Sequence, residues 1–420
     1  MTTTVVALRR VANIVNGGTP APDAENWGGA VPWATPVDLG KAHLASLADT
    51  DRTLTERGLA SGSSLVQPGA ILLSTRAPIG YASRNVVPMA FNQGCKAVVP
   101  SGSLDSRFGL YAIAHVAPQL QALGQGSTFL ELSTGSLGSV GIPVPESIDE
   151  QRHIADYLDA QTAKIDALIG KQEQLIETLA ERSQAVISHA VTKGLDPKAP
   201  MKDSGTDWLG AVPAAWGVAS LRRVLRYLTS GSRGWAEYYT DAGSAFIRIG
   251  NLPRGNLSLD MEDTQHVQIP LGAEGARSVT SEGDVLFSIT AYLGSVAIVD
   301  APNVGAYVSQ HVALARLDQR SILPSFVGYS MLSDAGQTQL GEQAYGGTKV
   351  QLSLGDIKEL VVATPPMREQ HQIVAYLNHE TAKIGALSAK AREMIAVLKE
   401  RRQALISAVV TGKIDVRGLA

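Results

Sequence analysis

Several short segments of this chain contain residue types found in catalytic motifs, but their order does not fit the chemistry. Residues 364–367 (TPPM) come nearest to the Asn/Asp-Pro-Pro-Tyr/Phe segment with which amino-methyltransferases hold a flipped base, yet they lack the amide or carboxylate and the aromatic ring. Residues 346–349 (GGTK) have the wrong order for a GxxxxGK[ST] phosphate-binding loop. No Asp…Glu-x-Lys nuclease core is convincing. The sequence therefore argues against a methyltransferase, an ATP motor or a nuclease on this chain.

Metal and redox chemistry have no more support. The eight histidines are scattered and Cys95 is the single cysteine, which leaves no metal-ligand spacing and no internal disulfide. Gly17 and Gly18 indicate a turn rather than a dinucleotide-binding loop. We therefore expect no cofactor or metal on this chain, and its cysteine usage favours the reducing cytoplasm.

The composition indicates a globular protein of several domains. The 420 residues allow two to four domains at roughly 100–200 residues each, and 45% hydrophobic with 18% charged residues is ordinary for such a chain. The formal net charge of −3 argues against tight DNA binding by this chain alone. The first residues do not predict a signal peptide, and no apolar run approaches roughly 18 residues, so we expect no membrane contact.

The chain repeats itself. Residues 150–196 align without a gap to residues 369–415, at an offset of 369 − 150 = 219, and about half of the paired positions are identical. A weaker repeat surrounds them: LRRV occurs at 8–11 and 221–224, and GAILLSTRAPIGYAS from Gly69 resembles GDVLFSITAYLGSVA from Gly283. Two units predict a pseudo-dimer within one polypeptide rather than a solenoid.

The well-matched segments are predicted to be long helices, each of about 45 residues and roughly 65 Å at 1.5 Å per residue. Their apolar residues recur at spacings near 3.5, which indicates an antiparallel coiled-coil pair with one seam per helix. The expected seam residues are Leu158, Ile165, Leu168, Leu175, Leu179 and Val186 in the first helix, and Leu377, Ile384, Leu387, Met394, Leu398 and Leu405 in the second.

The predicted helix ends have suitable capping residues. Ser147 and Glu150 fit a capping box at the first start. Pro365 suits the second start, because proline is tolerated in the first turn of a helix. Gly194 and Gly412 suit the two ends.

The remaining segments read as a linker and two β-rich domains. The linker has Trp208, Leu209 and Trp216 as expected hydrophobic anchors. Short β-branched stretches such as AILLST, KAVVP, FIRIG and DVLFSIT alternate with turn residues in both domains, and residues 111–122 and 325–340 are expected helices. The fold class is therefore predicted as mixed α/β and β-rich, with two pseudo-two-fold-related domains joined by two long antiparallel helices. The expected bounds are 1–146 for the first domain, 147–193 for the first helix, 194–216 for the linker, 217–363 for the second domain, 364–412 for the second helix and 413–420 for the tail.

The order and doubling of these motifs resemble the specificity subunits of type I restriction-modification systems. The segments that carry the resemblance span almost the whole chain. They are GGTPAP…VPWATPVDL (17–39), STRAPIG…FNQGCKAVVP (74–100), IPVPESIDEQRHIADYLDAQTAKID (142–166), MKDSGTDWLGAVPAAW (201–216) and TPPMREQHQIVAYLNHETAKI (364–384).

The resemblance implies a non-catalytic protein that reads double-stranded DNA. Each β-rich domain would be a target recognition domain for one half of a split sequence, and the helix pair would set the distance between the halves. Two methyltransferase subunits would dock on this scaffold and motor-nuclease subunits would join them. S-adenosylmethionine, ATP and Mg²⁺ would then be bound by those partners, and the complex would work in the cytoplasm.

Candidate DNA-binding residues follow from the side chains that read bases or hold phosphates, namely Arg, Asn, Gln, Lys, Ser and Thr on loops between strands. In the first domain they are Thr35, Asp38, Ser74, Thr75, Arg76, Asn92, Gln93, Lys96, Ser127 and Thr128. In the second domain they are Arg248, Asn251, Ser288, Thr290, Tyr292, Gln310, His311, Thr348, Lys349 and Gln351. Thr290 stands where the first domain has Arg76, which suggests two different half-sites.

Two other functions fit parts of the sequence. A coiled-coil adaptor with two protein- or carbohydrate-binding domains would explain the acidic charge. An enzyme with a cleft between two β-rich domains is disfavoured by the missing catalytic motifs. A neighbouring gene for an adenine methyltransferase would favour the DNA-reading hypothesis over both.

Overall fold

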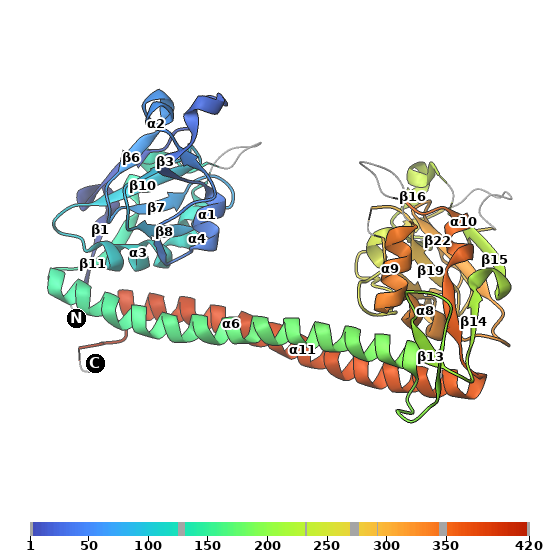
Figure 1. The fold of residues 1–420 in the computed structure, drawn as a ribbon. Helices are drawn as coiled ribbons and strands as arrows, with labels where there is room; N and C mark the ends of the chain where they lie inside the picture. Colours follow the sequence, from blue (N-terminus) through green and yellow to red (C-terminus); the bar gives the residue numbers. More distant parts are fainter. Residues whose placement is uncertain are drawn as a thin grey trace. The chain divides into compact units, whose positions relative to one another are not determined.

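The computed structural model describes residues 3–124, 131–231, 233–268, 277–291, 293–343 and 351–417. The chain divides into two compact units. Unit 1 comprises Met1–Gln172 and Glu393–Ala420, and unit 2 comprises Glu173–Arg392. Each unit contains a β-rich head and a stretch of both long helices (Figure 1). We refer to residues 3–146 as head 1 and to residues 217–366 as head 2.

Head 1 is built from three sheets and a set of short helices. Its main sheet has the strand order β2-β10-β7-β8-β4, a second has the order β5-β3-β9-β6, and β1 pairs with β11. The strands are β1 (Thr3–Ala7), β2 (Ala12–Asn16), β3 (Trp27–Ala34), β4 (Ser46–Leu47), β5 (Thr53–Leu54), β6 (Ser64–Val66), β7 (Ile71–Ser74), β8 (Ala82–Asn85), β9 (Met89–Phe91), β10 (Cys95–Pro100) and β11 (Gly141–Pro145). The helices are η1 (Leu8–Arg10), η2 (Ala24–Asn26), α1 (Pro36–Lys41), α2 (Glu56–Gly62), α3 (Ser106–His115), α4 (Ala117–Ala122) and α5 (Thr134–Ser139).

Head 2 repeats this plan. Its sheets have the orders β15-β22-β19-β20 and β16-β18-β17-β21, and β14 pairs with β23 as β1 does with β11. The strands are β14 (Gly217–Ser220), β15 (Leu225–Ser230), β16 (Tyr239–Thr240), β17 (Ser244–Ile247), β18 (Gln265–Val267), β19 (Val285–Ser288), β20 (Val296–Ile298), β21 (Tyr307–Val308), β22 (Val312–Leu317) and β23 (Val361–Thr364). The helices are η3 (Leu221–Arg223), η4 (Trp235–Tyr238), η5 (Ile249–Asn251), η6 (Ala301–Asn303), α8 (Pro324–Leu332), α9 (Asp334–Glu342) and α10 (Leu354–Glu359).

The central strand of each head explains why these residues form a sheet with two covered faces. Successive side chains on a strand point to opposite faces. In β7, Ile71 packs in the core that contains α3, whereas Leu72 packs in a second core on the other face. In β19, Phe287 and Leu286 divide between two cores in the same way. A strand buried on both faces has no exposed polar side, which accounts for the unbroken apolar runs in the sequence.

The expected short helices are present, with different bounds. The helix expected at 111–122 begins earlier, because the Asp105 carboxylate accepts from the backbone N–H groups of the first turn, and it is interrupted at Val116 before α4. The helix expected at 325–340 is likewise divided into α8 and α9, because Ser333 ends the first and caps the second. The strand expected in FIRIG ends at Ile247, and residues 249–251 form a 3₁₀ turn.

The two long helices predicted from the repeat are α6 (Ile148–Lys193), with 46 residues, and α11 (Met367–Val410), with 44 residues. They pack together, and each unit contains the beginning of one and the end of the other. In unit 1, Leu158 of α6 shares a core with Ile406 of α11 and with Phe108 of head 1. In unit 2, Ile187 of α6 shares a core with Leu377 of α11. The helices therefore run antiparallel and each head rests on both.

Part of the expected seam is wrong. Leu168 and Leu175 are 47% and 43% exposed, and the matching Leu387 and Met394 are 47% and 46% exposed, so these four do not lie in the seam. The buried or half-buried positions instead recur with strict 3-4 spacing, at 158, 162, 165, 169, 172, 176, 179 and 183 in α6 and 219 residues later in α11. The reason is that a polar residue, Thr162, occupies a core position by donating its hydroxyl to the Leu158 carbonyl. A seam predicted from the leucines alone therefore misses this register.

The linker between α6 and head 2 is ordered by its aromatic residues. It forms a hairpin of β12 (Met201–Asp203) and β13 (Ala211–Pro213). Trp216 is buried and its Nε1 donates to Glu369 at 2.9 Å, and Trp208 donates to Glu342 at 2.7 Å. Leu209 is buried in the core of unit 2. The three expected anchors thus all hold the linker against the second unit.

Among the helices in the described part of the chain, none is both long and apolar enough to span a bilayer.

A buried glutamine joins each head to its long helix. Gln151 of α6 is fully buried, accepts from the Asp105 N–H at 2.8 Å and donates to the carbonyls of Ser103 and Pro145. Gln370 of α11 makes the same three contacts in unit 2, with the Leu323 N–H and two carbonyls. Both amides therefore satisfy three backbone groups at the junction.

Replacing Gln151 with leucine should destabilise the protein by about 3 kcal/mol or more, because buried backbone groups left without partners cost about 1–3 kcal/mol each. Urea denaturation followed by circular dichroism measures this loss. Gln174→Leu is the matched control, since Gln174 lies exposed on the same helix. A loss of less than about 1 kcal/mol for Gln151→Leu would show that the three contacts of Gln151 are dispensable.

Candidate nucleic-acid interface

Three loops of head 1 meet at the end of β7. The N–H groups of Thr75 and Arg76 both donate to the Gly94 carbonyl, at 2.8 and 3.3 Å, and the Leu132 N–H donates to the Thr75 carbonyl at 2.8 Å. Arg76 and Glu131 also form an isolated β-bridge. We call this meeting of residues 74–76, 92–94 and 131–132 the loop junction of head 1.

The same junction exists in head 2. The Ile289 N–H donates to the His311 carbonyl at 3.0 Å, the Leu352 N–H donates to the Ile289 carbonyl at 3.0 Å, and Thr290 bridges to Gln351. The sequence-predicted candidates on these loops are therefore brought together in each head. Five further candidates lie outside the described residues: Ser127, Thr128, Tyr292, Thr348 and Lys349.

Several predicted candidates are buried and hold the loops in shape. Ser74 is fully buried, and its hydroxyl donates to the Pro78 carbonyl at 2.7 Å and accepts from the Tyr81 N–H at 2.9 Å. Thr75 is also fully buried, with its hydroxyl 3.2 Å from the Gly94 carbonyl. In head 2, Ser288 takes the place of Ser74, is 1% exposed and accepts from a backbone N–H. These hydroxyls are used inside the protein.

The accessible side chains at the junction of head 1 are Arg76 and Gln93. The Arg76 guanidinium pairs with the Glu131 carboxylate at 3.1 Å, and the two side chains remain 41% and 39% exposed. Gln93 is exposed at the tip of its turn, while Asn92 is half-buried and accepts from the Gly94 N–H at 2.6 Å. An exposed ion pair of this kind is weak, so the guanidinium can exchange its partner at little cost.

Lys96 places a positive charge under this junction. It is 6% exposed, and its ammonium donates to Asn16 Oδ1 at 2.8 Å, which also accepts from the Thr134 hydroxyl. Burial lowers the pKa of Lys96, and Glu131 opposes that change. Asn16, Thr134 and Glu131 were not among the sequence-predicted residues. Their role depends on pairing across 55 to 118 positions, which no local pattern signals.

Thr35 and Asp38 form a capping box at the start of α1. The Thr35 N–H donates to Asp38 at 2.8 Å, the Asp38 N–H donates to the Thr35 hydroxyl at 3.4 Å, and Asp38 also accepts from the Asp51 N–H at 3.0 Å. Asp38 is 3% exposed. A Cβ on Gly94 would lie 3.5 Å from Pro36 Cγ and 3.6 Å from Arg76 Cδ, so the beginning of α1 lies beside the junction.

The corresponding pair in head 2 is Arg248 and Asn251. Asn251 is 3% exposed, accepts from the Arg248 N–H at 2.8 Å and donates to the Asp260 carbonyl at 2.8 Å. The Arg248 guanidinium contacts the carbonyl and carboxylate of Asp263, both at 3.1 Å. Both residues thereby fix the 260–263 loop to the sheet.

The junction of head 2 has neutral polar side chains where head 1 has charges. The Thr290 hydroxyl lies 2.9 Å from His311 Nδ1, and Gln310 Nε2 lies 3.1 Å from His311 Nε2. If the Gln310 amide donates, the neutral ring carries its proton on Nδ1 and donates it to Thr290. Head 1 has Arg76 and Gly94 at the positions of Thr290 and His311. Equivalent loops therefore present different donors and acceptors.

Within the described residues, no group of three or more His, Cys, Asp or Glu side chains is arranged to hold a metal ion. Cys95 is buried, and burial raises the pKa of its thiol to about 12. The described residues of the junctions offer hydrogen-bond donors, acceptors and charge. Their donors and acceptors are of the kinds that read base edges and phosphates.

Comparison with known proteins places this chain in a family. The family model described as the type I restriction modification DNA specificity domain matches residues 2–178 and 248–393. The specificity subunit of the type I restriction enzyme MjaIX from Methanocaldococcus jannaschii is 25% identical over 427 residues, covering 99% of this chain and 94% of that protein. The EcoBI specificity subunit from Escherichia coli is 23% identical, covering 79% of this chain and 70% of that protein.

A solved structure supports the same fold. A chain from work on complex assembly and conformational transition of a type I restriction-modification system has a TM-score of 0.72 and 16% identity, and the match covers 98% of each chain. That chain therefore shares the fold of β-rich heads and two long packed helices. The chain belongs to the family of type I restriction-modification specificity subunits. It is the non-catalytic DNA-recognition component of such a complex, which decides against the adaptor and cleft-enzyme alternatives.

Buried and exposed candidates at the interface should differ sharply in their effect on folding. Asp38→Ala removes the cap of α1 and the acceptor for Asp51, and should destabilise the protein by about 2 kcal/mol. Arg76→Ala removes only an exposed ion pair and should cost less than about 1 kcal/mol. Chemical denaturation of both variants checks this, and a larger loss for Arg76→Ala than for Asp38→Ala would contradict the geometry.

Proposed function

We propose that this chain reads an asymmetric bipartite DNA sequence, with one half-site for each head. The supporting observation is the pair of loop junctions, which share a backbone framework but carry different side chains. Arg76 of head 1 corresponds in position to Thr290 of head 2, and Gly94 corresponds to His311. A common framework would approach each half-site in the same way, while different donors and acceptors would select different bases.

Within each junction the accessible residues would contact DNA. Arg76 has the fork geometry for guanine, and Gln93 and Gln310 have the paired donor and acceptor for adenine. Exchange of Glu131 for a base edge would release Arg76 without exposing a buried group. The buried candidates Thr75, Asp38, Asn251 and Ser288 would act by positioning these loops, and Lys96 would add positive potential beneath them. We also propose DNA contacts for the candidates outside the described residues and for Asn92, Gln351 and Arg248.

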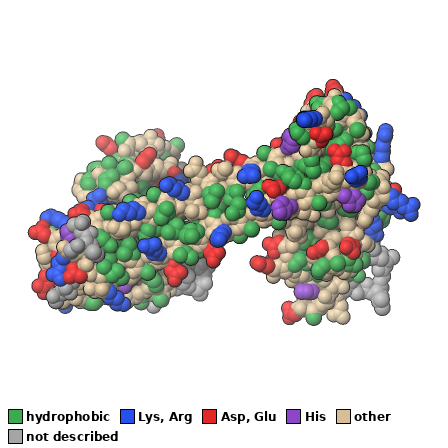
Figure 2. Space-filling model, turned by 90° about the horizontal axis from the view of Figure 1, so that it is seen from below, with side chains coloured by type: hydrophobic (Ala, Val, Ile, Leu, Met, Phe, Trp, Pro, Cys, Tyr) green, Lys and Arg blue, Asp and Glu red, His purple; other side chains and the backbone are tan. Residues whose placement is uncertain are grey.

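The long helices would carry the partner subunits. Leu168 and Leu175 on α6, and their counterparts Leu387 and Met394 on α11, expose apolar surface that has no use in the seam. The view from below Figure 1 shows hydrophobic side chains interspersed with charged side chains of both signs (Figure 2). Exposed apolar surface of this kind marks protein contacts. Two copies of it, 219 residues apart, would suit two identical methyltransferase subunits.

The rest of the complex follows from this role. The methyltransferase subunits would bind S-adenosylmethionine, and motor-nuclease subunits would bind ATP and Mg²⁺. The compartment would be the cytoplasm, because the DNA target is there. This division of labour agrees with a chain whose sequence contains no convincing catalytic motif.

Arg76→Ala tests the assignment of head 1. If Arg76 makes a bidentate base contact, its loss should weaken the cognate complex by about 1–3 kcal/mol and relax one base position in one half-site only. Methylome sequencing of cells that contain the variant and the methyltransferase reports both half-sites at once. Gln310→Ala should relax the opposite half-site.

Arg84→Ala is the matched control. Arg84 lies on β8, opposite Ile71 at the far end of β7 from the junction, and its guanidinium contacts Ser46. It should leave the methylated motif unchanged. Relaxation of the same half-site by Arg76→Ala and Gln310→Ala, or of neither, would contradict one half-site per head.

A further inference from the structure

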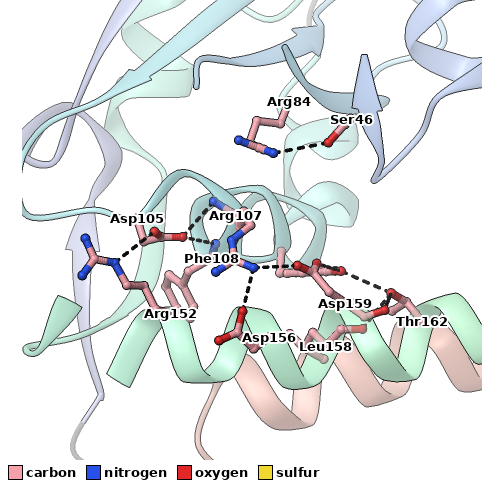
Figure 3. Close-up of polar contacts among 11 residues, drawn as sticks. Ser46, Arg84, Asp105, Arg107, Phe108, Arg152, Asp156, Leu158, Asp159 and Thr162 are labelled. Carbon is pink, nitrogen blue, oxygen red and sulfur yellow. Dashed lines mark hydrogen bonds and ion pairs between the residues drawn. The ribbon is translucent and has the colours of Figure 1, made fainter. Parts of the chain in front are cut away.

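The junction between head 1 and the long helices is held by an ionic network. Arg107 of α3 contacts Asp156 at 2.7 Å and Asp159 at 3.0 Å, both on α6 (Figure 3). The Tyr111 hydroxyl donates to Asp159 at 2.7 Å. Charges of both signs therefore fill the space between the head and its helices.

A second ion pair of the same network joins the two long helices in unit 1. Arg402 of α11 contacts Asp166 of α6 at 3.1 Å, and the Arg402 side chain is only 17% exposed. This largely buried guanidinium therefore links the two helices.

Unit 2 has lost every charge of this network at the matching positions. Arg107 corresponds to Ser325, which precedes Phe326 as Arg107 precedes Phe108. At the offset of 219, Asp156 and Asp159 correspond to Ala375 and Asn378, and Asp166 and Arg402 correspond to Gly385 and Ser183. The match is structural as well, because the Tyr329 hydroxyl contacts Asn378 and Thr381 as Tyr111 contacts Asp159 and Thr162.

A cleft of about 910 Å³ is found where these side chains are missing. It lies within unit 2 between the end of α6, the beginning of α11 and the loop around Leu257. Its walls include Ser183, Gly385 and Asn378, the small or neutral replacements for the network of unit 1. Small-molecule sites have volumes of roughly 300–1,000 Å³, so the cleft can take a ligand of that size.

The charge of this cleft is positive. Arg254 and Arg392 belong to its lining, which lies entirely within the described residues and contains no Asp or Glu. At the offset of 219, Arg392 of α11 stands where α6 has Glu173, so the sign of the charge is reversed between the two helices at that position. Asp334 accepts from Gln184 and Ser188 nearby but does not line the cleft.

The donors in the lining select among anions. Besides the two arginines, the lining residues include five that carry hydroxyls, namely Ser183, Ser258, Tyr329, Thr381 and Ser388. A carboxylate has one charge and two oxygens, whereas a terminal phosphate has up to two charges and three oxygens and is a preferred partner of arginine. A lining with two arginines and several hydroxyl-bearing residues therefore matches a phosphate better than a carboxylate.

We propose that this cleft of unit 2 is a binding site for a small phosphate-bearing molecule. The site is separate from the loop junctions and does not depend on DNA reading. At the matching positions of unit 1, the paired side chains of Arg402 and Asp166 stand where the cleft has Ser183 and Gly385. The two units thereby differ in charge and side-chain size at this place.

Titration calorimetry of the full chain with pyrophosphate and with inorganic phosphate tests the proposal. Both should bind, and Arg392→Glu, which introduces the residue type found at the matching position of α6, should weaken pyrophosphate binding about tenfold or more, since hydrogen bonds to charged groups contribute at that level. Arg254→Gln should weaken it in the same direction. Lys390→Gln is the control, because Lys390 is exposed on α11 and does not line the cleft.

Four outcomes would overturn the site. They are no pyrophosphate binding at millimolar concentration, equal binding by the wild type and both arginine variants, tighter binding of citrate than of pyrophosphate, or binding of an oligoglutamate peptide in place of pyrophosphate. Circular dichroism of each variant checks folding. Arg392→Glu should leave the methylated DNA motif unchanged, which separates this test from that of the proposed function, and a changed motif would assign the cleft to DNA reading instead.

Discussion

The structure depends on the burial of one apolar seam along each long helix. A helix of 46 or 44 residues with a single apolar stripe is not stable alone in water, and its stripe must be covered along its length. The partner is the other helix of the same chain, in the antiparallel direction. Because each helix follows one head directly and ends under the other, this pairing fixes which secondary structures meet in each unit. The buried side chains of Gln151 and Gln370 then attach each head to the helix that follows it.

The scaffold is repeated while its polar surfaces are not. Leu158 and Leu377, Tyr111 and Tyr329, and the paired glutamines keep the same contacts in both units, since a change there would leave a cavity or an unsatisfied backbone group. Exposed loop side chains can change without leaving a cavity or an unsatisfied backbone group. Arg76 and Thr290 occupy equivalent backbone bridges in the two heads but have different side-chain chemistry. A duplicated frame with diverged loops is what a reader of two unlike half-sites requires.

The same divergence extends to the base of the heads. The ionic network of unit 1 and the cationic cleft of unit 2 occupy matching places. Arg402 and Asp166 form an ion pair in unit 1, whereas Ser183 and Gly385 at the matching positions line the cleft of unit 2. Divergence of an internal repeat can therefore create a cavity by deleting both partners of an ion pair. Such paired deletion avoids an uncompensated charge, which would be the costly change.

Much of this architecture could be predicted from the sequence, and the reasons for the failures are physical. The repeat gave the two heads and the two helices, because periodicity and internal identity are local properties. The seam register was wrong at Leu168 because Thr162 can occupy a core position when its hydroxyl bonds to its own helix. Asp38 and Ser74 have the residue types of a DNA contact but are used as a cap and a loop support. Glu131 was missed because its pairing with Arg76 exists only after folding.

The central claim is our proposal that each head reads one half-site and that the helix pair sets the distance between the half-sites. Inserting one heptad into both α6 and α11 at matching positions keeps the seam in register and lengthens each helix by about 10 Å at 1.5 Å per residue. Methylome sequencing with the cognate methyltransferase should then show both half-sites unchanged and a longer spacer, by about three base pairs at roughly 34 Å per ten base pairs. Methylation of a motif whose spacer has its original length would contradict the claim.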